Sequence, residues 1–200
     1  MIGIIIPTQY FPPISTFSSI YHGYDVLIEK YENYQKKSHR NRAYVTGPNG
    51  IQFISIPLQG GRNQTIITDI HISYDEDWVK SHLESLKTYY RSSPYYEFYI
   101  DEISNILNSE YQNLFELNSS ILIYLLKALR IDARPKFTES YLIEYPNFTD
   151  LRRSSVSKYQ NPLYSGKSYR QVFTDKVKFT PDLSILDLLF NHGPESIYYL

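Results

Sequence analysis

Met1-Ile2-Gly3-Ile4-Ile5-Ile6-Pro7 is the stretch of sequence that decides the fold. Its isoleucines form a short, continuous apolar run of mostly β-branched residues, and Pro7 ends it. Such a run is typical of a strand that is buried on both faces, which is the usual state of a strand in a parallel sheet. The sequence therefore predicts a strand at the centre of a parallel sheet.

A helix and a second strand are expected directly after this run. Pro12-Pro13 predict an extended turn, and either Ser15 or Thr16 can cap a short helix that ends near Tyr21. Asp25 to Glu29 then has the apolar character of a strand. The three elements make a βαβ unit, so the predicted fold class is α/β, with a small, mostly parallel (mixed) sheet that this unit begins.

Two further strand features are expected before the helices. Gly47-Pro48-Asn49-Gly50 separates Tyr44-Val45 from Gln52 to Leu58, which predicts a hairpin whose Asn49-Gly50 supply the positive φ angles of a type I′ turn. Ile66 to Ser73 alternates between apolar and polar residues, which predicts another strand.

A helical half and a loop-rich end follow. Helices are predicted from Asp75, as the N-cap, to Ser92-Ser93-Pro94, and then over two further segments with helical spacing of apolar residues. The remaining chain is predicted to hold a return strand, loops with one short helix, and a closing helix that Gly193 stops. The two further helices are expected over about 95–108 and about 111–129, and the return strand over 132–137. The loops with the short helix occupy 138–169, and the closing helix 183–193.

Composition narrows the classes of function. The chain has 200 residues and no Pro/Gly/Ser-rich linker, which predicts one domain. Its 20 Lys and Arg against 21 Asp and Glu give a formal net charge of -1, which argues against broad attraction to nucleic acid or to an anionic membrane. It has no cysteine, so disulfides, thiolate metal sites and Cys nucleophiles are excluded. The apolar start is too short for a signal segment or a membrane span, so a cytoplasmic protein is expected.

A polar segment, Asn33 to Arg42, holds the main candidate for anion binding. Arg40 and Arg42, two residues apart on an extended strand, would point to one face and could together clamp a diphosphate or a carboxylate. Exposed surface charge is the plain alternative. Asn41 and Asn49 complete this group of candidate substrate-binding residues. Asn41 would face away from the two arginines, and the main role expected of Asn49 is to form the turn.

Two other candidates lie near the expected cleft. Gln9 and Tyr10 follow the first strand, where open α/β sheets place their ligands, and could orient a substrate; packing against the first helix is the alternative. His82 lies one turn after Trp78 and is the candidate proton carrier, although a structural histidine is the more common case. The five histidines show no recognised metal spacing, so neither a metal nor another cofactor is predicted.

Several motifs, in order along nearly the whole chain, resemble the WbqC-like protein family. They are Pro7-Thr8-Gln9-Tyr10-Phe11-Pro12-Pro13, His39-Arg40-Asn41-Arg42 with Pro48-Asn49-Gly50, Trp78 with His82, Tyr90-Arg91-Ser92-Ser93-Pro94, and the segment from Leu183 to Gly193. The resemblance implies one family domain over residues 1–200, with a mainly strand-rich part (1–73), a helical part (74–130) and a return strand, loops and terminal helix (131–200). It also marks Arg152, Lys158 and Gln171 as further substrate-binding candidates, with an anchored loop as the alternative.

The resemblance implies a bacterial cytoplasmic protein of surface-polysaccharide (O-antigen, lipopolysaccharide) biosynthesis. The expected substrate is a nucleotide-linked amino sugar or a similar anionic small molecule, and the expected reaction is aminoacyl or acyl group transfer. Many members carry His-Gln-Pro at the end of the first strand, where this chain has Ile6, Pro7 and Thr8. That difference favours the alternative of a non-catalytic ligand-binding or assembly protein. A nucleotidyltransferase-like activity is a weaker alternative, and a homodimer is compatible with the sequence.

Overall fold

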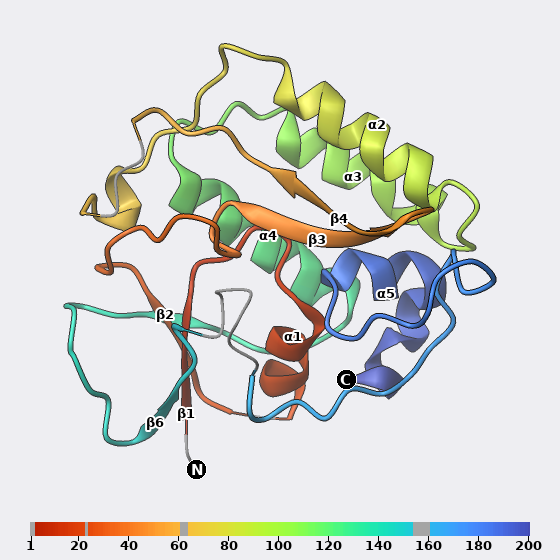
Figure 1. Cartoon of the computed structure of the whole chain (residues 1–200). Helices are drawn as coiled ribbons and strands as arrows, with labels where there is room; N and C mark the ends of the chain where they lie inside the picture. Colours follow the sequence, from red (N-terminus) through yellow and green to blue (C-terminus); the bar gives the residue numbers. More distant parts are fainter. Residues whose placement is uncertain (1–2, 23, 61–63, 154–160) are drawn as a thin grey trace.

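The computed structural model of the chain describes residues 3–22, 24–60, 64–153 and 161–200. A four-stranded sheet has the order β5-β2-β1-β6, made of β1 (Gly3–Pro7), β2 (Val26–Glu29), β5 (Lys136–Phe137) and β6 (Phe148–Asp150). All three pairings in it are parallel. Together with a separate two-stranded sheet and five helices, this confirms the predicted α/β class (Figure 1).

The first βαβ unit is present as predicted. β1 lies between β2 and β6, and all five of its residues are buried, as the unbroken apolar run requires. α1 (Ile14–Tyr21) connects it to β2, and Ile4 pairs with Val26. The N-cap of α1 is Pro13 rather than Ser15 or Thr16, and it makes no side-chain capping bond, so that detail of the prediction is wrong.

The hairpin consists of β3 (Arg42–Gly47) and β4 (Gly50–Ser55). Gly50 has a φ of +103°, whereas Asn49 is not among the residues with positive φ, so the turn is not type I′ as predicted. Pro48 and Asn49 occupy its centre because Gly47 pairs with Gly50. The Tyr90 hydroxyl accepts a hydrogen bond from the Thr46 amide at 3.2 Å and so ties the hairpin to the helical half.

The three predicted helices of the helical half are confirmed as α2 (Trp78–Tyr90), α3 (Tyr96–Leu107) and α4 (Leu114–Ala128). The N-cap of α2 is Asp77, whose carboxylate accepts from the Lys80 amide, rather than Asp75. Figure 1 shows α2 and α3 as neighbouring helices on the side of the hairpin away from β1 and β6. No helix in the described part of the chain is both long and apolar enough to cross a membrane.

The predicted strand at Ile66 to Ser73 is wrong. The segment contains a short 3-10 helix, η1 (Ile67–Asp69), and its pairing within the described residues consists of isolated bridges: Asn33 with Ile66, Leu58 with Ile72, and His71 with Asn113. Its apolar pattern arises because Ile67, Ile70 and Ile72 are all buried, with a helical turn between the first two.

The C-terminal part contains two elements that the sequence did not reveal. β6 lies within 138–169, where only loops and a short helix were expected, and η2 (Gly193–Tyr199) follows the predicted closing helix, α5 (Ile185–His192). β5 confirms the predicted return strand but is only two residues long. β6 has three residues with no fully buried side chain, so no apolar run marks it in the sequence.

Gly193 is the position where this part of the chain should tolerate change least. Its φ is +53° and its ψ is -128°, and a Cβ atom there would lie 2.5 Å from Cδ1 of Tyr95. We expect Gly193→Ala to reduce the free energy of unfolding by about 2–4 kcal/mol, from backbone strain plus overpacking. Urea denaturation followed by the fluorescence of the single tryptophan, Trp78, measures this loss.

Gly60→Ala is the matched control. Gly60 also has a positive φ, +58°, but a Cβ atom there would meet nothing within 4 Å. Its loss should be confined to backbone strain, about 1 kcal/mol. Equal losses in the two variants would show that contact with Tyr95 contributes nothing.

Candidate functional site

The carboxyl ends of the parallel strands lie beside two adjoining hollows. Open α/β sheets place their ligands at this edge. The larger hollow, called here the sheet-edge pocket, has a volume of about 880 Å³, and the smaller, the cationic hollow, about 260 Å³. Tyr34 and Lys36 line both. The two hollows are therefore parts of one candidate site.

The sheet-edge pocket combines aromatic, amide and charged side chains. Such a lining suits a sugar, since tyrosine faces pack against sugar rings and the polar groups bind hydroxyls. The chemistry-bearing residues are Tyr31, Tyr34, Tyr141, Asn33, Gln35, Glu32, Asp150, Lys36, Arg152 and Arg153.

Glu29, at the end of β2, organises the base of this pocket. Its side chain is fully buried and accepts hydrogen bonds from Arg152 Nη1 (3.2 Å), the Thr138 hydroxyl (2.8 Å) and the Tyr145 hydroxyl (3.2 Å). Arg152 also donates from Nη2 to Asp150 at 2.7 Å. The ends of β2, β5 and β6 are thereby joined by one buried network.

Arg152 holds a loop over this network. Its guanidinium donates to the carbonyl groups of Leu142 and Ile143, at 2.8 and 3.0 Å, and lies about 5 Å from the ring centres of Tyr141 and Tyr145. Its carboxylate partners raise the pKa of Arg152 despite burial, while the same pairing lowers the pKa of Asp150. The structure therefore places Arg152 in the pocket wall and also gives it the loop-anchoring contacts that were the alternative.

Arg40 and Glu32 form a buried ion pair. Arg40 is fully buried, and its guanidinium binds both oxygens of Glu32, with Nε at 2.8 Å from Oε1 and Nη2 in contact with Oε2. Arg40 lies in a turn before β3, so the prediction that it shares a strand face with Arg42 is wrong. The nearby Glu32 carboxylate takes Arg40 into the interior, whereas Arg42 lines the cationic hollow.

Arg42 is the partly exposed arginine of the cationic hollow. Its guanidinium lies 4.8 Å from the Phe53 ring centre, and its buried Nε has no hydrogen-bond partner in the part of the chain that the structure describes. Lys36 and Lys37 line the same hollow. A buried N–H without a partner is costly, and an anion placed here would satisfy it.

Asn41 and Asn49 differ in placement. Asn41 lines the cationic hollow, but its amide is engaged: Oδ1 accepts from the Tyr34 hydroxyl at 2.9 Å, and Nδ2 donates to the Ile56 carbonyl at 2.9 Å. Asn49 lies in the hairpin turn and lines neither hollow.

Tyr10 and His82 pair in the interior. The Tyr10 hydroxyl lies 2.9 Å from Nδ1 of His82. Tyr10 is fully buried, and His82 is 5% exposed. Burial lowers the pKa of His82 to about 4, and a hydrogen bond with the Ser55 backbone only partly opposes this. His82 is thus neutral at physiological pH. Neither residue lines the two hollows, so their expected catalytic roles stay predictions.

The other candidates also lie away from the two hollows. Gln9 accepts from the Thr16 hydroxyl at 2.9 Å and borders a small space of about 10 Å³. Gln171 donates to the buried Asp187 carboxylate at 3.1 Å, beside Tyr169. Lys158 lies outside the described residues. In the described ranges, no three His, Asp or Glu side chains gather closely enough to hold a metal ion.

Glu29, Glu32 and the tyrosines of the pocket were not among the sequence candidates. The available signal was position, because Glu29 ends a predicted strand and Glu32 follows three residues later, at the edge where ligands bind. Tyrosines are spread along the whole chain, so composition did not single these out.

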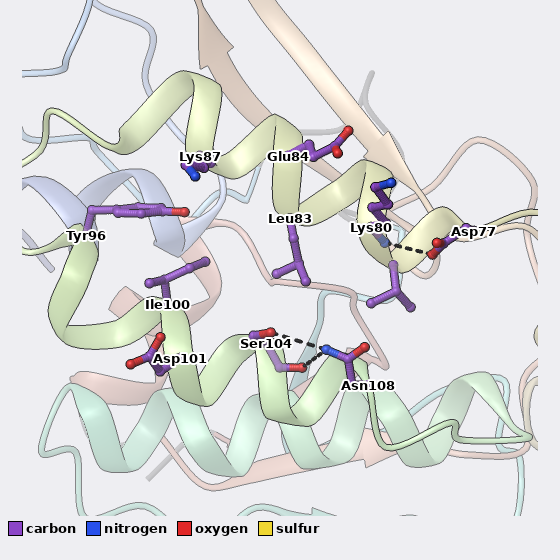
Figure 2. Close-up of a pocket in the computed structure, with 11 residues that line it drawn as sticks. Asp77, Lys80, Leu83, Glu84, Lys87, Tyr96, Ile100, Asp101, Ser104 and Asn108 are labelled. Carbon is purple, nitrogen blue, oxygen red and sulfur yellow. Dashed lines mark hydrogen bonds between the residues drawn. The ribbon is translucent and has the colours of Figure 1, made fainter.

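A groove between α2 and α3, about 350 Å³ in volume, is explained by helix packing. Figure 2 shows Leu83 and Ile100 pointing into the space between the two helices, with charged side chains around them. The Asn108 amide there is used within its own helix, donating to the carbonyl and hydroxyl oxygens of Ser104. Apolar side chains between two amphipathic helices with a charged rim are ordinary packing, so the sheet edge is the better candidate.

Comparisons with known proteins agree with the resemblance in the sequence. The model of the WbqC-like protein family matches residues 8–161 and 153–199. The chain is also similar to the uncharacterized protein Rv1507c of Mycobacterium tuberculosis, with 26% identity over 222 residues that cover 98% of this chain and 96% of that protein. No solved structure matches the chain.

The buried ion pair predicts a large effect on stability. Arg40→Met leaves the Glu32 carboxylate buried without its partner, so we expect the free energy of unfolding to fall by about 3–5 kcal/mol. The double variant Arg40→Met/Glu32→Leu removes both charges and should recover most of this loss. Urea denaturation of the three proteins provides the measurement. A double variant no more stable than the single one would contradict the ion-pair account.

His82 predicts a dependence of stability on pH. Its pKa is about 4 in the folded protein and 6.5 in the unfolded chain, so the unfolded chain binds more protons between these values. Its stabilising contribution is present above pH 6.5 and is lost as the pH falls, by about 2 kcal/mol between pH 6.5 and pH 5. Burial also lowers the pKa of His39 to about 4, so it adds a similar loss.

His82→Gln should therefore make the fall in unfolding free energy between pH 6.5 and 5 shallower, without abolishing it. Chemical denaturation at several pH values measures the slope. His71→Gln, at an exposed position, is the control and should keep the wild-type slope. An unchanged slope in His82→Gln would contradict the buried neutral histidine.

Proposed function

The chain belongs to the WbqC-like protein family, and on that premise we propose that it is an enzyme of bacterial surface-polysaccharide biosynthesis that binds a nucleotide-linked amino sugar. The family is linked to gene clusters for O-antigen biosynthesis. The proposed reaction is aminoacyl or acyl group transfer to the sugar. The proposed location is the cytoplasm, where nucleotide-linked sugars are used.

One observation carries the proposed ligand: Arg42, whose buried Nε has no hydrogen-bond partner among the described residues, lines one hollow together with Lys36 and Lys37. Three cationic side chains in one small hollow suit a diphosphate, because phosphate oxygens accept several charge-assisted hydrogen bonds. The adjoining sheet-edge pocket, with its tyrosines and amides, suits the sugar. The shared lining by Tyr34 allows one ligand to occupy both hollows.

The proposal predicts that Arg42 contributes directly to affinity. Arg42→Ala should weaken binding of UDP-glucosamine about tenfold or more, since a hydrogen bond to a charged group contributes about 1.5–3 kcal/mol. Isothermal titration calorimetry measures the dissociation constant. Arg91→Ala, at an exposed position after α2, is the matched control and should bind as wild type does. Equal affinity of Arg42→Ala and wild type would refute the proposed anion site.

A non-catalytic binding protein of the same pathway is the second candidate. It is favoured by the burial of Tyr10 and His82, which removes both sequence-derived catalytic candidates from the pocket lining. Incubating UDP-glucosamine with the protein and a bacterial small-molecule extract separates the two candidates. A mass increase on the sugar that wild type produces and Arg42→Ala does not would support the transferase, and recovery of unmodified ligand from wild type would support the binding protein.

A further inference from the structure

A small space at the carboxyl end of β1 is separate from the two hollows of the candidate site. It is called here the strand-end space, and its volume is about 10 Å³. That volume is close to the smallest that holds one water molecule. Its wall includes Thr8 and Gln9, which follow β1, together with Ile28 of β2 and Asn118 and Leu122 of α4. The space therefore lies where the central strand of the sheet ends against α4.

Asn118 brings a buried hydrogen-bond acceptor to this wall. Its side chain is 1% exposed, and its Nδ2 donates to the Arg40 carbonyl oxygen at 2.8 Å. Because a carbonyl oxygen only accepts, this bond fixes which end of the amide is the nitrogen. Oδ1 is then the other end, and in the part of the chain that the structure describes it has no hydrogen-bond partner. A buried amide oxygen without a donor is destabilising, so this atom calls for a donor.

Two further polar side chains lie in the same wall. Thr8 and Gln9 are both 4% exposed. Oε1 of Gln9 accepts from the Thr16 hydroxyl at 2.9 Å, so the amide nitrogen of Gln9 is the group that can donate to a molecule in the space. The Thr8 hydroxyl can donate or accept. A buried water is held by about two to four polar partners, whereas apolar cavities stay dry. The polar wall of the strand-end space thus suits water.

We propose that Oδ1 of Asn118 binds one buried water molecule in the strand-end space. The water donates to Oδ1 and is held from the other side by Thr8 or Gln9, so it links the residues after β1 to α4. The volume decides the occupant, because a sugar ring or a phosphate group is far larger than one water. The inference is independent of the proposed function, since the strand-end space and the two hollows have different lining residues.

A high-resolution crystal structure of the wild-type protein tests the proposal directly. It should show a water about 2.7–3.2 Å from Oδ1 of Asn118, with a second contact to Thr8 or Gln9. An Oδ1 bonded to a donor of the protein itself, or an Oδ1 with no water within this distance, would overturn the proposal.

Nuclear Overhauser measurements test the same water in solution. The methyl groups of Ile28 and Leu122 should show cross-peaks to water that have opposite signs in NOESY and ROESY spectra, which marks a slowly exchanging water. Leu125, a fully buried residue of α4 outside this wall, is the control and should show no such peaks. Cross-peaks of the same sign at both methyl-bearing residues, or none at either, would contradict a bound water.

Two substitutions assign the water to Oδ1 of Asn118. Both remove the donor to the Arg40 carbonyl, but Asn118→Leu also removes Oδ1, whereas Asn118→Asp keeps an oxygen in its place. The water cross-peaks should be lost in Asn118→Leu and kept in Asn118→Asp. Loss in both would assign the effect to the bond with Arg40, and retention in both would mean that another group binds the water, so either result refutes the role of Oδ1. If the variants do not fold, the wild-type crystal structure decides.

Discussion

The buried carboxylate of Glu29 is the charge on which the arrangement of the sheet edge depends. A carboxylate in the interior is destabilising by several kcal/mol unless charge and hydrogen bonds compensate it. Here the compensating donors come from four separate places in the chain: Tyr31, Thr138, Tyr145 and Arg152. Because they must converge on one point, β2, the residues after β5 and the residues after β6 are held in one arrangement. The short strands β5 and β6 could not fix this arrangement by their own backbone hydrogen bonds.

A second buried network fixes the hairpin and the helices relative to one another, as the contacts of Glu29 fix the sheet edge. The Tyr90 hydroxyl donates to the buried Asp187 carboxylate at 2.8 Å and accepts from the Thr46 amide, so α2, α5 and β3 meet at one side chain. Burial raises the pKa of Asp187, and the hydroxyls of Tyr169 and Tyr90 oppose that rise. Tyrosine serves well in such positions because its ring packs in the core while its hydroxyl still reaches a polar partner. Part of the high tyrosine content of the chain therefore has a structural explanation.

Sequence was informative where one local pattern decides the outcome. The apolar run of β1, the turn at Pro48 and the amphipathic pattern of α2 to α4 each express a local preference, and each gave the right element. The strand β6 has no such pattern, since it exists through its parallel pairing with β1. The position of Arg40 likewise depends on Glu32 across a turn, so spacing alone placed it wrongly on a strand face. The hollows of the candidate site come from long-range packing of this kind, which is why the family could be predicted from the sequence but the pocket lining could not.

Arg40 and Arg42 show how one side-chain chemistry takes on two roles two residues apart. A guanidinium group has five N–H donors, and each donor that becomes buried needs a hydrogen-bond acceptor. The guanidinium of Arg40 is fully buried and donates to the Glu32 carboxylate, so this side chain has a structural role inside the protein. Arg42 lines the cationic hollow, and among the described residues its buried Nε has no hydrogen-bond partner. The same side chain thus has its donors bound within the fold at position 40 and has an unbound donor at position 42.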